Sequence, residues 1–153
     1  STSKFMSEII TINSGMPYVI LRYFNVYGPR QKDHFIPEFI ERIKRKKYEL
    51  YGFKNTRSFI YIDDAIKATI KASNIKKNNE IINIGSDIET RIIDVARLIM
   101  RILKINTKKL KLFSAPKGSV LRRKPDISKL EKIIGNTNFL SLEEGIKLLV
   151  KKK

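Results

Sequence analysis

Hydrophobic residues recur along this chain at two kinds of spacing, one typical of helices and one typical of strands. Phe5, Ile9 and Ile12 lie three or four residues apart and share one face of a helix predicted over residues 4–13. The apolar run at residues 18–23 predicts a strand buried on both faces. The same spacings predict further helices at residues 36–47, 63–73, 90–102, 126–134 and from 141 onward, and strands at 48–51, 58–62, 81–84 and 111–113.

Polar residues at the predicted helix ends support these boundaries. Asp63 and Thr90 are expected to cap the helices that begin there, and Gly135 is expected to end the helix before it. The string Ser-Leu-Glu-Glu at residues 141–144 matches the capping-box pattern. The alternation of helices and strands predicts an α/β fold with a parallel sheet and a smaller, α-rich C-terminal portion.

The glycines argue against one common use of such a fold. A dinucleotide-binding domain needs clustered glycines after its first strand, because only glycine lets the backbone approach a pyrophosphate. The chain has seven glycines, and no two of them lie close together in the sequence. We therefore expect no dinucleotide-binding fingerprint in this chain.

Composition excludes several classes of site and of location. With 153 residues, 42% of them hydrophobic, the chain can form one domain with a sizeable core. No run of about eighteen apolar residues occurs and the N-terminus lacks a signal-peptide pattern, so we expect a cytoplasmic location and no membrane insertion. The chain has no Cys and a single His, which excludes disulfides, thiolate metal sites, imidazole clusters and an ordinary Ser/His/Asp triad.

The formal charge of +17 suggests an anionic partner such as nucleic acid. We favour a different explanation, because Lys is spread over predicted loops and helix ends and is accompanied by abundant Ile and Asn. Such joint enrichment in Lys, Ile and Asn is typical of a biased amino-acid composition across the whole source genome. The basic clusters have no interleaved aromatic residues of the kind that stack on bases, so we do not expect nucleic acid as a partner. A basic, non-catalytic module that binds nucleic acid or anionic glycans stays open as the alternative function.

Five strings in order carry a resemblance that covers nearly the whole chain: STSK, LRYFNVYGPRQ, TRSFIYIDDA, INIGS and GSVLRRKPDISK. Together they resemble the second half of the extended short-chain dehydrogenase/reductases, the NAD-dependent nucleotide-sugar epimerases, dehydratases and decarboxylases. The resemblance implies the C-terminal half of a Rossmann-like parallel sheet plus a small mixed α/β substrate-binding portion. Residues 1–35 and 58–90 would form the sheet side, and residues 36–57 and 91–153 most of the substrate-binding portion.

The resemblance assigns the catalytic and cofactor-binding roles. In the family a Tyr-x-x-x-Lys helix places a lysine on the nicotinamide ribose, where its charge lowers the tyrosine pKa. Lys4 fits that lysine and Ser1 to Ser3 fit the spacer, so the tyrosine would precede Ser1. Without the other strings, these residues would be interpreted as a helix cap and a surface charge. Tyr23, Phe24 and Val26 match residues that line the nicotinamide and sugar region, although Tyr23 could instead be a core aromatic.

The resemblance also assigns substrate contacts. Asn25 and Arg57 match an asparagine and an arginine that reach the substrate diphosphate, and a guanidinium fork suits phosphate oxygens. Arg122 matches an arginine that approaches the nucleotide, and Asn83 ends the last parallel strand beside the cleft. The chain departs from the commonest pattern at residues 116–119, where many epimerases read Arg-x-Gly-Asp and this chain reads Pro-Lys-Gly-Ser. The acid expected to bond the nucleotide ribose is therefore absent.

The resemblance implies a nucleotide-sugar substrate, with a lean toward UDP-linked sugars and toward the decarboxylase-like and epimerase-like members. The cofactor would be NAD, bound mostly by a missing N-terminal half. No metal site is expected. We expect this chain to be inactive alone, and its partners to be a separate N-terminal half or a second copy in a homodimer.

Overall fold

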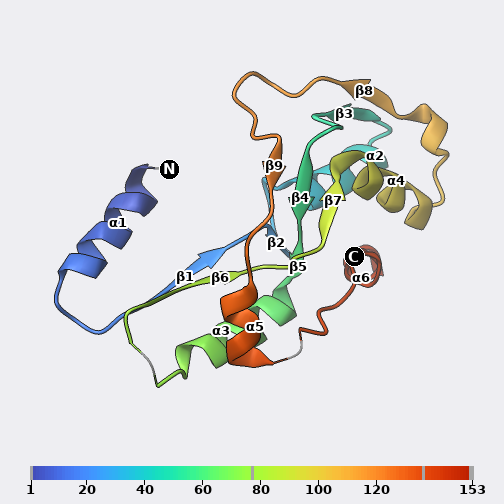
Figure 1. Cartoon of the computed structure of the whole chain (residues 1–153). Coiled ribbons are helices and arrows are strands. Elements are labelled where there is room, and N and C mark those ends of the chain that lie inside the picture. Colours follow the sequence, from blue (N-terminus) through green and yellow to red (C-terminus); the bar gives the residue numbers. More distant parts are fainter. Residues whose placement is uncertain (1, 77, 136, 152–153) are drawn as a thin grey trace.

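The computed structural model describes residues 2–76, 78–135 and 137–151 as an α/β protein with short parallel strand pairs (Figure 1). The helices are α1 (Thr2–Asn13), α2 (Phe35–Lys44), α3 (Ile62–Ser73), α4 (Ile92–Ile102), the 3-10 turn η1 (Thr107–Lys109), α5 (Ser128–Ile134) and α6 (Leu142–Lys151). The strands are β1 (Val19–Tyr23), β2 (Val26–Tyr27), β3 (Glu49–Tyr51), β4 (Thr56–Ser58), β5 (Ile60–Tyr61), β6 (Glu80–Ile84), β7 (Glu89–Arg91), β8 (Lys111–Phe113) and β9 (Arg122–Arg123).

The strands pair in four small groups. β1 pairs in parallel with β6, from Val19 opposite Glu80 to Tyr23 opposite Ile84, while β2 pairs with β5 and β3 with β8. The fourth group has the order β7-β4-β9, in which β4 is antiparallel to β7 and parallel to β9. The predicted parallel sheet is therefore present, as pairs that join distant parts of the chain.

The prediction that the first strand is buried on both faces is wrong. β1 is at most half-buried, and its last two residues, Arg22 and Tyr23, are exposed. Val19 and Leu21 pack into the core beneath the strand, whereas Arg22 turns the other way and reaches Glu8 of α1. The apolar run indicated the strand correctly, but α1 covers the second face too loosely to bury it.

Two hydrophobic cores hold the fold together. The larger lies among α2, α4, α6 and β3, and its buried members include Phe39, Leu50, Ile99 and Ile146. The smaller lies where α3 and α5 pack on β1 and β6, in the lower part of Figure 1. In α4 the apolar stripe faces inward as its spacing predicts, because Ile92, Val95 and Ile99 are all buried.

Helix α1 stands apart from both cores at the far left of Figure 1, and it has no buried residue. Its apolar side chains are left open to solvent, with Phe5 62% and Ile10 66% exposed. Its polar face carries Lys4 and Glu8, one turn apart. An exposed apolar helix face of this kind normally marks a contact surface.

The capping predictions are only partly confirmed. Ser141 and Glu144 form the capping box, since the Glu144 N–H donates to the Ser141 hydroxyl (3.2 Å) and the Ser141 N–H donates to the Glu144 carboxylate (3.0 Å). Asp63 and Thr90 do not cap their helices: Tyr61 and Arg91 occupy the N-cap positions, and neither makes a side-chain cap bond. The reason is that β5 and β7 run directly into α3 and α4.

Candidate functional site

A pocket of about 290 Å³ lies where β2 and β4 meet the start of α2. Its walls come from the loop that follows β2, from the first turn of α2, from the end of β3 and from β4. Ligands in α/β folds bind beyond the carboxyl ends of the strands, and this pocket has that position for β2. Its polar lining consists of Asn25, Gln31, Asp33, His34, Tyr51, Asn55 and Arg57.

Asn25, one of the lining residues, has a left-handed backbone conformation with φ of 40°. Asparagine tolerates that conformation better than most residues. Its side-chain amide donates a 2.8 Å hydrogen bond to the Ser58 carbonyl, which ties the turn after β1 to β4. Asn25 is therefore fixed beside Arg57, whose strand it contacts.

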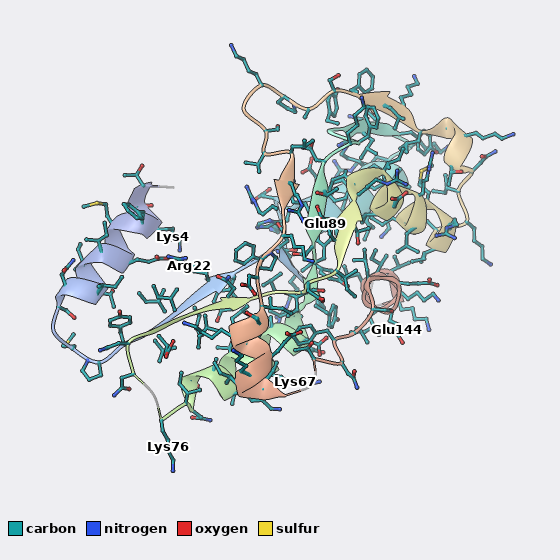
Figure 2. The ribbon with its side chains drawn as sticks, viewed as in Figure 1. Lys4, Arg22, Lys67, Lys76, Glu89 and Glu144 are labelled. Carbon is teal, nitrogen blue, oxygen red and sulfur yellow. The ribbon has the colours of Figure 1, made fainter. Side chains whose placement is uncertain are left out.

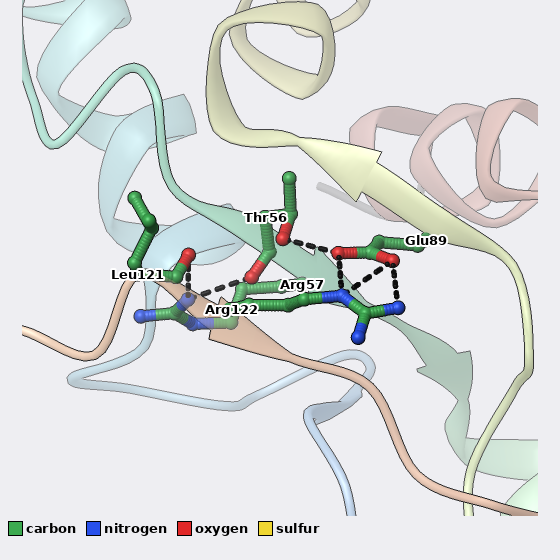
Figure 3. A network of polar contacts seen from close by, with 5 residues as sticks. All are labelled: Thr56, Arg57, Glu89, Leu121 and Arg122. Atoms are coloured by element: carbon green, nitrogen blue, oxygen red, sulfur yellow. Dashed lines mark hydrogen bonds and ion pairs between the residues drawn. The ribbon is translucent and has the colours of Figure 1, made fainter.

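Arg57 is held by backbone carbonyls of its own strand, β4, and of the segment that precedes β9. Its Nη1 donates to the carbonyls of Thr56 (2.6 Å) and Leu121 (3.3 Å), and its Nη2 donates to the Val120 carbonyl (2.7 Å); the bonds to Thr56 and Leu121 are visible in Figure 3. Burial lowers the pKa of Arg57, and the nearby positive charge of Arg123 lowers it further. A guanidinium held in this way, with no carboxylate bonded to it in the described chain, is suited to an anionic ligand.

Arg122 has a different environment, although it lies on the neighbouring strand. Its guanidinium donates to both carboxylate oxygens of Glu89 at 2.9 to 3.0 Å, and Thr56 Oγ1 donates to the same carboxylate at 2.5 Å (Figure 3). These bonds lower the pKa of Glu89 to about 2. Arg122 does not line the pocket, and its charge is balanced by Glu89.

The remaining predicted residues of this region lie on or beside β1 and β6. Tyr23 is half exposed and shares a 2.9 Å hydrogen bond with Thr69 of α3, so it is not a core aromatic. The Asn83 amide donates to the Asp126 carbonyl at 2.8 Å. Phe24 continues the β1 ladder through its N–H, and Val26 lines the pocket.

Lys4 lies on α1, away from the pocket, and no hydrogen bond or ion pair of its side chain is found in the described parts of the chain. It shares a helix face with Glu8, whose carboxylate binds Arg22 of β1 at 2.9 and 2.5 Å. This face therefore turns toward β1, as Figure 2 shows for Lys4 and Arg22. Ser1, the first residue of the predicted spacer, lies outside the described residues.

The structure thus brings Asn25, Val26 and Arg57 together around one pocket. The other predicted site residues lie outside it: Lys4, Tyr23, Phe24, Asn83 and Arg122. The pocket also has polar lining residues that sequence reasoning missed. Gln31 is one: its Nε2 donates to the Val26 carbonyl at 2.8 Å, while its buried Oε1 has no hydrogen-bond partner in the described chain. Its place at the end of the LRYFNVYGPRQ string was the signal for it. His34 and Asn55 had no such signal.

A larger hollow of about 710 Å³ lies along α2 and residues 28–33. None of the predicted site residues lines it, so we place the candidate site in the smaller pocket. In residues 2–76, 78–135 and 137–151, no group of three or more His, Cys, Asp or Glu side chains could hold a metal ion. No helix in the same residues is long and apolar enough to cross a membrane.

Comparisons with curated proteins agree with the resemblance of the five strings. The chain is 39% identical over 144 residues to UDP-N-acetyl-alpha-D-glucosaminuronate decarboxylase of Bacillus cytotoxicus, which covers 87% of this chain and 45% of that protein. It is 37% identical over 143 residues to a putative UDP-glucose 4-epimerase of Methanocaldococcus jannaschii, with 89% and 45% covered. The chain therefore spans about half the length of the curated relatives it matches.

Solved structures show the same correspondence. UDP-glucuronic acid 4-epimerase from Bacillus cereus, in complex with UDP-glucuronic acid and NAD, matches with a TM-score of 0.84 and 31% identity over 97% of this chain and 48% of that chain. UDP-glucose 4-epimerase from Thermotoga maritima with UDP-glucose matches with a TM-score of 0.81 and 30% identity, covering 98% and 50%. The model of the NAD dependent epimerase/dehydratase family matches residues 1–85. This chain belongs to the NAD-dependent epimerase/dehydratase family.

Proposed function

We propose that this chain forms the sugar-nucleotide-binding half of an NAD-dependent enzyme that acts on a UDP-linked sugar, in the epimerase or decarboxylase branch of the family. The observation that carries the proposal is the pocket that Asn25, in the turn between β1 and β2, and Arg57 of β4 line together. The names of the similar decarboxylase and of the two similar epimerases all specify UDP-sugars. The pocket residues have the chemistry that a diphosphate requires, a guanidinium fork and an amide donor.

In this proposal Arg57 and Asn25 contact the substrate diphosphate. The carbonyl bonds from Val120 and Leu121 aim the Arg57 guanidinium, and the unpartnered Oε1 of Gln31 offers an acceptor for a hydroxyl or N–H of the ligand. Asn83 acts indirectly, since its amide is bonded to the Asp126 carbonyl and shapes the loop before α5.

NAD would supply hydride transfer at a sugar carbon, but this chain holds only part of a site for it. Its isolated glycines cannot form the turn that cradles a pyrophosphate. Lys4 provides a cation on the α1 face that turns toward β1, where it suits a ribose hydroxyl. Tyr23, Phe24 and Val26 would line the nicotinamide side. The rest of the NAD site is therefore assigned to other polypeptide, and the chain alone is proposed to be inactive.

The exposed apolar face of α1 supports the same proposal. Four of its apolar side chains are each at least 36% exposed: Phe5, Ile9, Ile10 and Ile12. Exposing this much apolar surface to water is unfavourable unless another surface packs against the helix. A polypeptide that carries the missing half of the sheet, or a second copy of the chain, would cover them.

Calorimetry of the isolated chain tests the proposal. We expect saturable binding of UDP that depends only mildly on salt, and no micromolar binding of NAD. Arg57→Ala should weaken UDP binding, whereas Arg91→Ala, which removes an arginine outside the pocket, should not. Micromolar NAD binding by the chain alone would contradict the assignment to a half-enzyme. Binding of nucleic acid that falls steeply with salt, without UDP binding, would favour the basic binding module instead.

A further inference from the structure

The pairing of β3 with β8 joins two lysine-rich segments that are far apart in the sequence. Residues 44–47 read Lys-Arg-Lys-Lys and lead into β3, while residues 104–117 contain five lysines and no acidic residue. The Lys111 N–H donates to the Tyr48 carbonyl at 2.9 Å, so the two segments meet at the start of the strand pair. Figure 1 shows β8 beside β3 at the upper edge of the molecule. The fold thus gathers positive charge that is dispersed in the sequence.

The lysines at this end of the strand pair have no acidic partner. Glu49, the register partner of Lys111, forms its ion pair with Arg42 at 3.8 Å. Lys47, Lys109 and Lys111 are exposed, and none of them has an ion pair in the described parts of the chain. Positive charges gathered without counter-charges repel one another and raise the local concentration of anions. An anionic partner would therefore be attracted to this end of the pair.

The same strand pair places aromatic rings among these lysines. The Tyr48 ring centroid lies 5.7 Å from Lys109 Nζ. At the other end of the pair, Tyr51 and Phe113 are register partners, and their rings stack with centroids 5.0 Å apart and an angle of 20° between the planes. Both rings stay about half exposed, Tyr51 at 52% and Phe113 at 41%. Sequence alone does not show this arrangement, because the rings and the lysines are brought together by the pairing of two strands.

We propose that this basic-aromatic face binds single-stranded RNA. The face consists of six residues: Lys47, Tyr48, Tyr51, Lys109, Lys111 and Phe113. Proteins that bind single strands without sequence preference combine cations that follow the backbone with aromatic rings on which bases stack. Both components are present along β3 and β8. RNA is the favoured partner because its bases are accessible in single-stranded segments, whereas cellular DNA keeps its bases paired inside a duplex.

The exposed ring stack favours RNA over an anionic glycan or an anionic membrane, since nucleobases offer flat π-faces to an aromatic ring. RNA binding at this face is also independent of the proposed function. Tyr51 borders the candidate pocket, but Phe113 and the three lysines do not line it. Binding of RNA and binding of UDP can therefore be measured and perturbed separately.

Fluorescence anisotropy of the chain with a labelled oligouridylate tests the charged part of the face. We expect affinity to fall as salt rises from about 50 to 200 mM, because each phosphate contact contributes about 0.7 to the slope of log K against log salt. Lys109→Gln and Lys111→Gln should each lower that slope by about 0.7. Lys76→Gln is the matched control, because Lys76 is exposed and lies at the lower end of the molecule in Figure 2, and it should leave the slope unchanged.

Phe113 tests the stacking part of the face. Phe113→Leu keeps an apolar side chain without a π-face and should weaken RNA binding by at least about fivefold at constant salt, whereas Phe113→Tyr should stay within about twofold of the wild type. Both variants should bind UDP like the wild type, because Phe113 does not line the candidate pocket. Since the Phe113 side chain is 41% exposed, neither substitution should unfold the chain.

The inference is overturned if the wild type does not bind the oligouridylate, or if Lys76→Gln lowers the salt slope as much as Lys109→Gln does. It is also overturned if Phe113→Leu binds RNA like the wild type, since the face would then attract any polyanion through charge alone. In that case heparin and phosphatidylserine vesicles, titrated in parallel, should bind as tightly as RNA. Failure of the wild type to bind UDP would count against the proposed function and leave RNA binding at this face intact.

Discussion

Tyr27 is buried in the larger core with its hydroxyl unsatisfied. The residue is 2% exposed, and its ring packs edge-on against Phe59 and Tyr61 at centroid distances of 6.2 and 5.5 Å. Its hydroxyl has no hydrogen-bond partner in the described chain, and burial raises its pKa. A buried polar group without a partner costs about 1–3 kcal/mol. Tyr27→Phe removes that cost and leaves the ring contacts in place.

The hydroxyl also limits what can stand opposite it. A Cβ added at Gly145 of α6 would lie 2.0 Å from the Tyr27 hydroxyl oxygen, and 2.9 and 3.1 Å from Cζ and Cε2 of the ring. Replacing glycine by alanine inside a helix normally stabilises it by about 1 kcal/mol. Overpacking a core costs about 1–3 kcal/mol, and a 2.0 Å contact belongs at the upper end of that range. Gly145→Ala should therefore destabilise the protein on balance.

We expect Tyr27→Phe to raise the free energy of unfolding by about 1 kcal/mol, and the melting temperature by about 2–4 °C for a chain of this size. The double variant Tyr27→Phe/Gly145→Ala should recover only part of the loss, because the two ring contacts remain too short. Denaturant unfolding at pH 7 measures all three variants. Tyr23→Phe is the control, since it removes an exposed hydroxyl that does have a partner, Thr69. A loss of stability in Tyr27→Phe would refute the reasoning, because it would mean that the buried hydroxyl is satisfied.

Three further predictions concern a cap, a core residue and an ion pair. Ser141→Ala should lower the free energy of unfolding by about 1 kcal/mol because it removes the capping box of α6, as denaturant unfolding can show. Ile99→Ala should cost about 2–5 kcal/mol in the same assay, and more than Ile102→Ala, because Ile99 is fully buried and Ile102 is not. The third prediction uses pH. Since the folded pKa of Glu89 is about 2, below its ordinary value of 4.5, its stabilising effect is complete above pH 4.5 and is lost as pH falls toward 2. Melting temperatures between pH 5 and 2 should therefore fall more steeply in the wild type than in Glu89→Gln.

The helices that sequence reasoning located well are those with one strong apolar stripe. The stripe through Val95 and Ile99 specifies both the period and the buried face of α4, and that information is local. The start of α4 was misplaced because β7 enters the helix without a break, so Arg91 takes the N-cap position and Thr90 remains in the strand. A residue type that favours helix caps, such as Thr90, does not reveal that the residue belongs to the preceding strand.

The site shows the same division between local and long-range information. Asn25 and Arg57 could be located from their strings, and the pocket brings both together. The pairing of Arg122 with Glu89 could not be predicted in this way, because β9 is only two residues long and contains no periodic pattern that would say which way its two arginines point. Which of the two shares the sheet face of Arg57 depends on the register with β4, and that register is a contact between residues more than 60 positions apart.

The carbonyl bonds to Arg57 have a consequence for affinity. A free arginine side chain has about 2 kcal/mol of rotamer entropy to lose when a ligand immobilises it. Here Thr56, Val120 and Leu121 already restrain the guanidinium in the unliganded protein, so most of that loss is incurred during folding. The segment that precedes β9 thus holds the Arg57 side chain in one orientation through its backbone carbonyls. If Arg57 binds an anion as proposed, shortening or loosening that segment should weaken binding, even though residues 114–121 do not line the pocket.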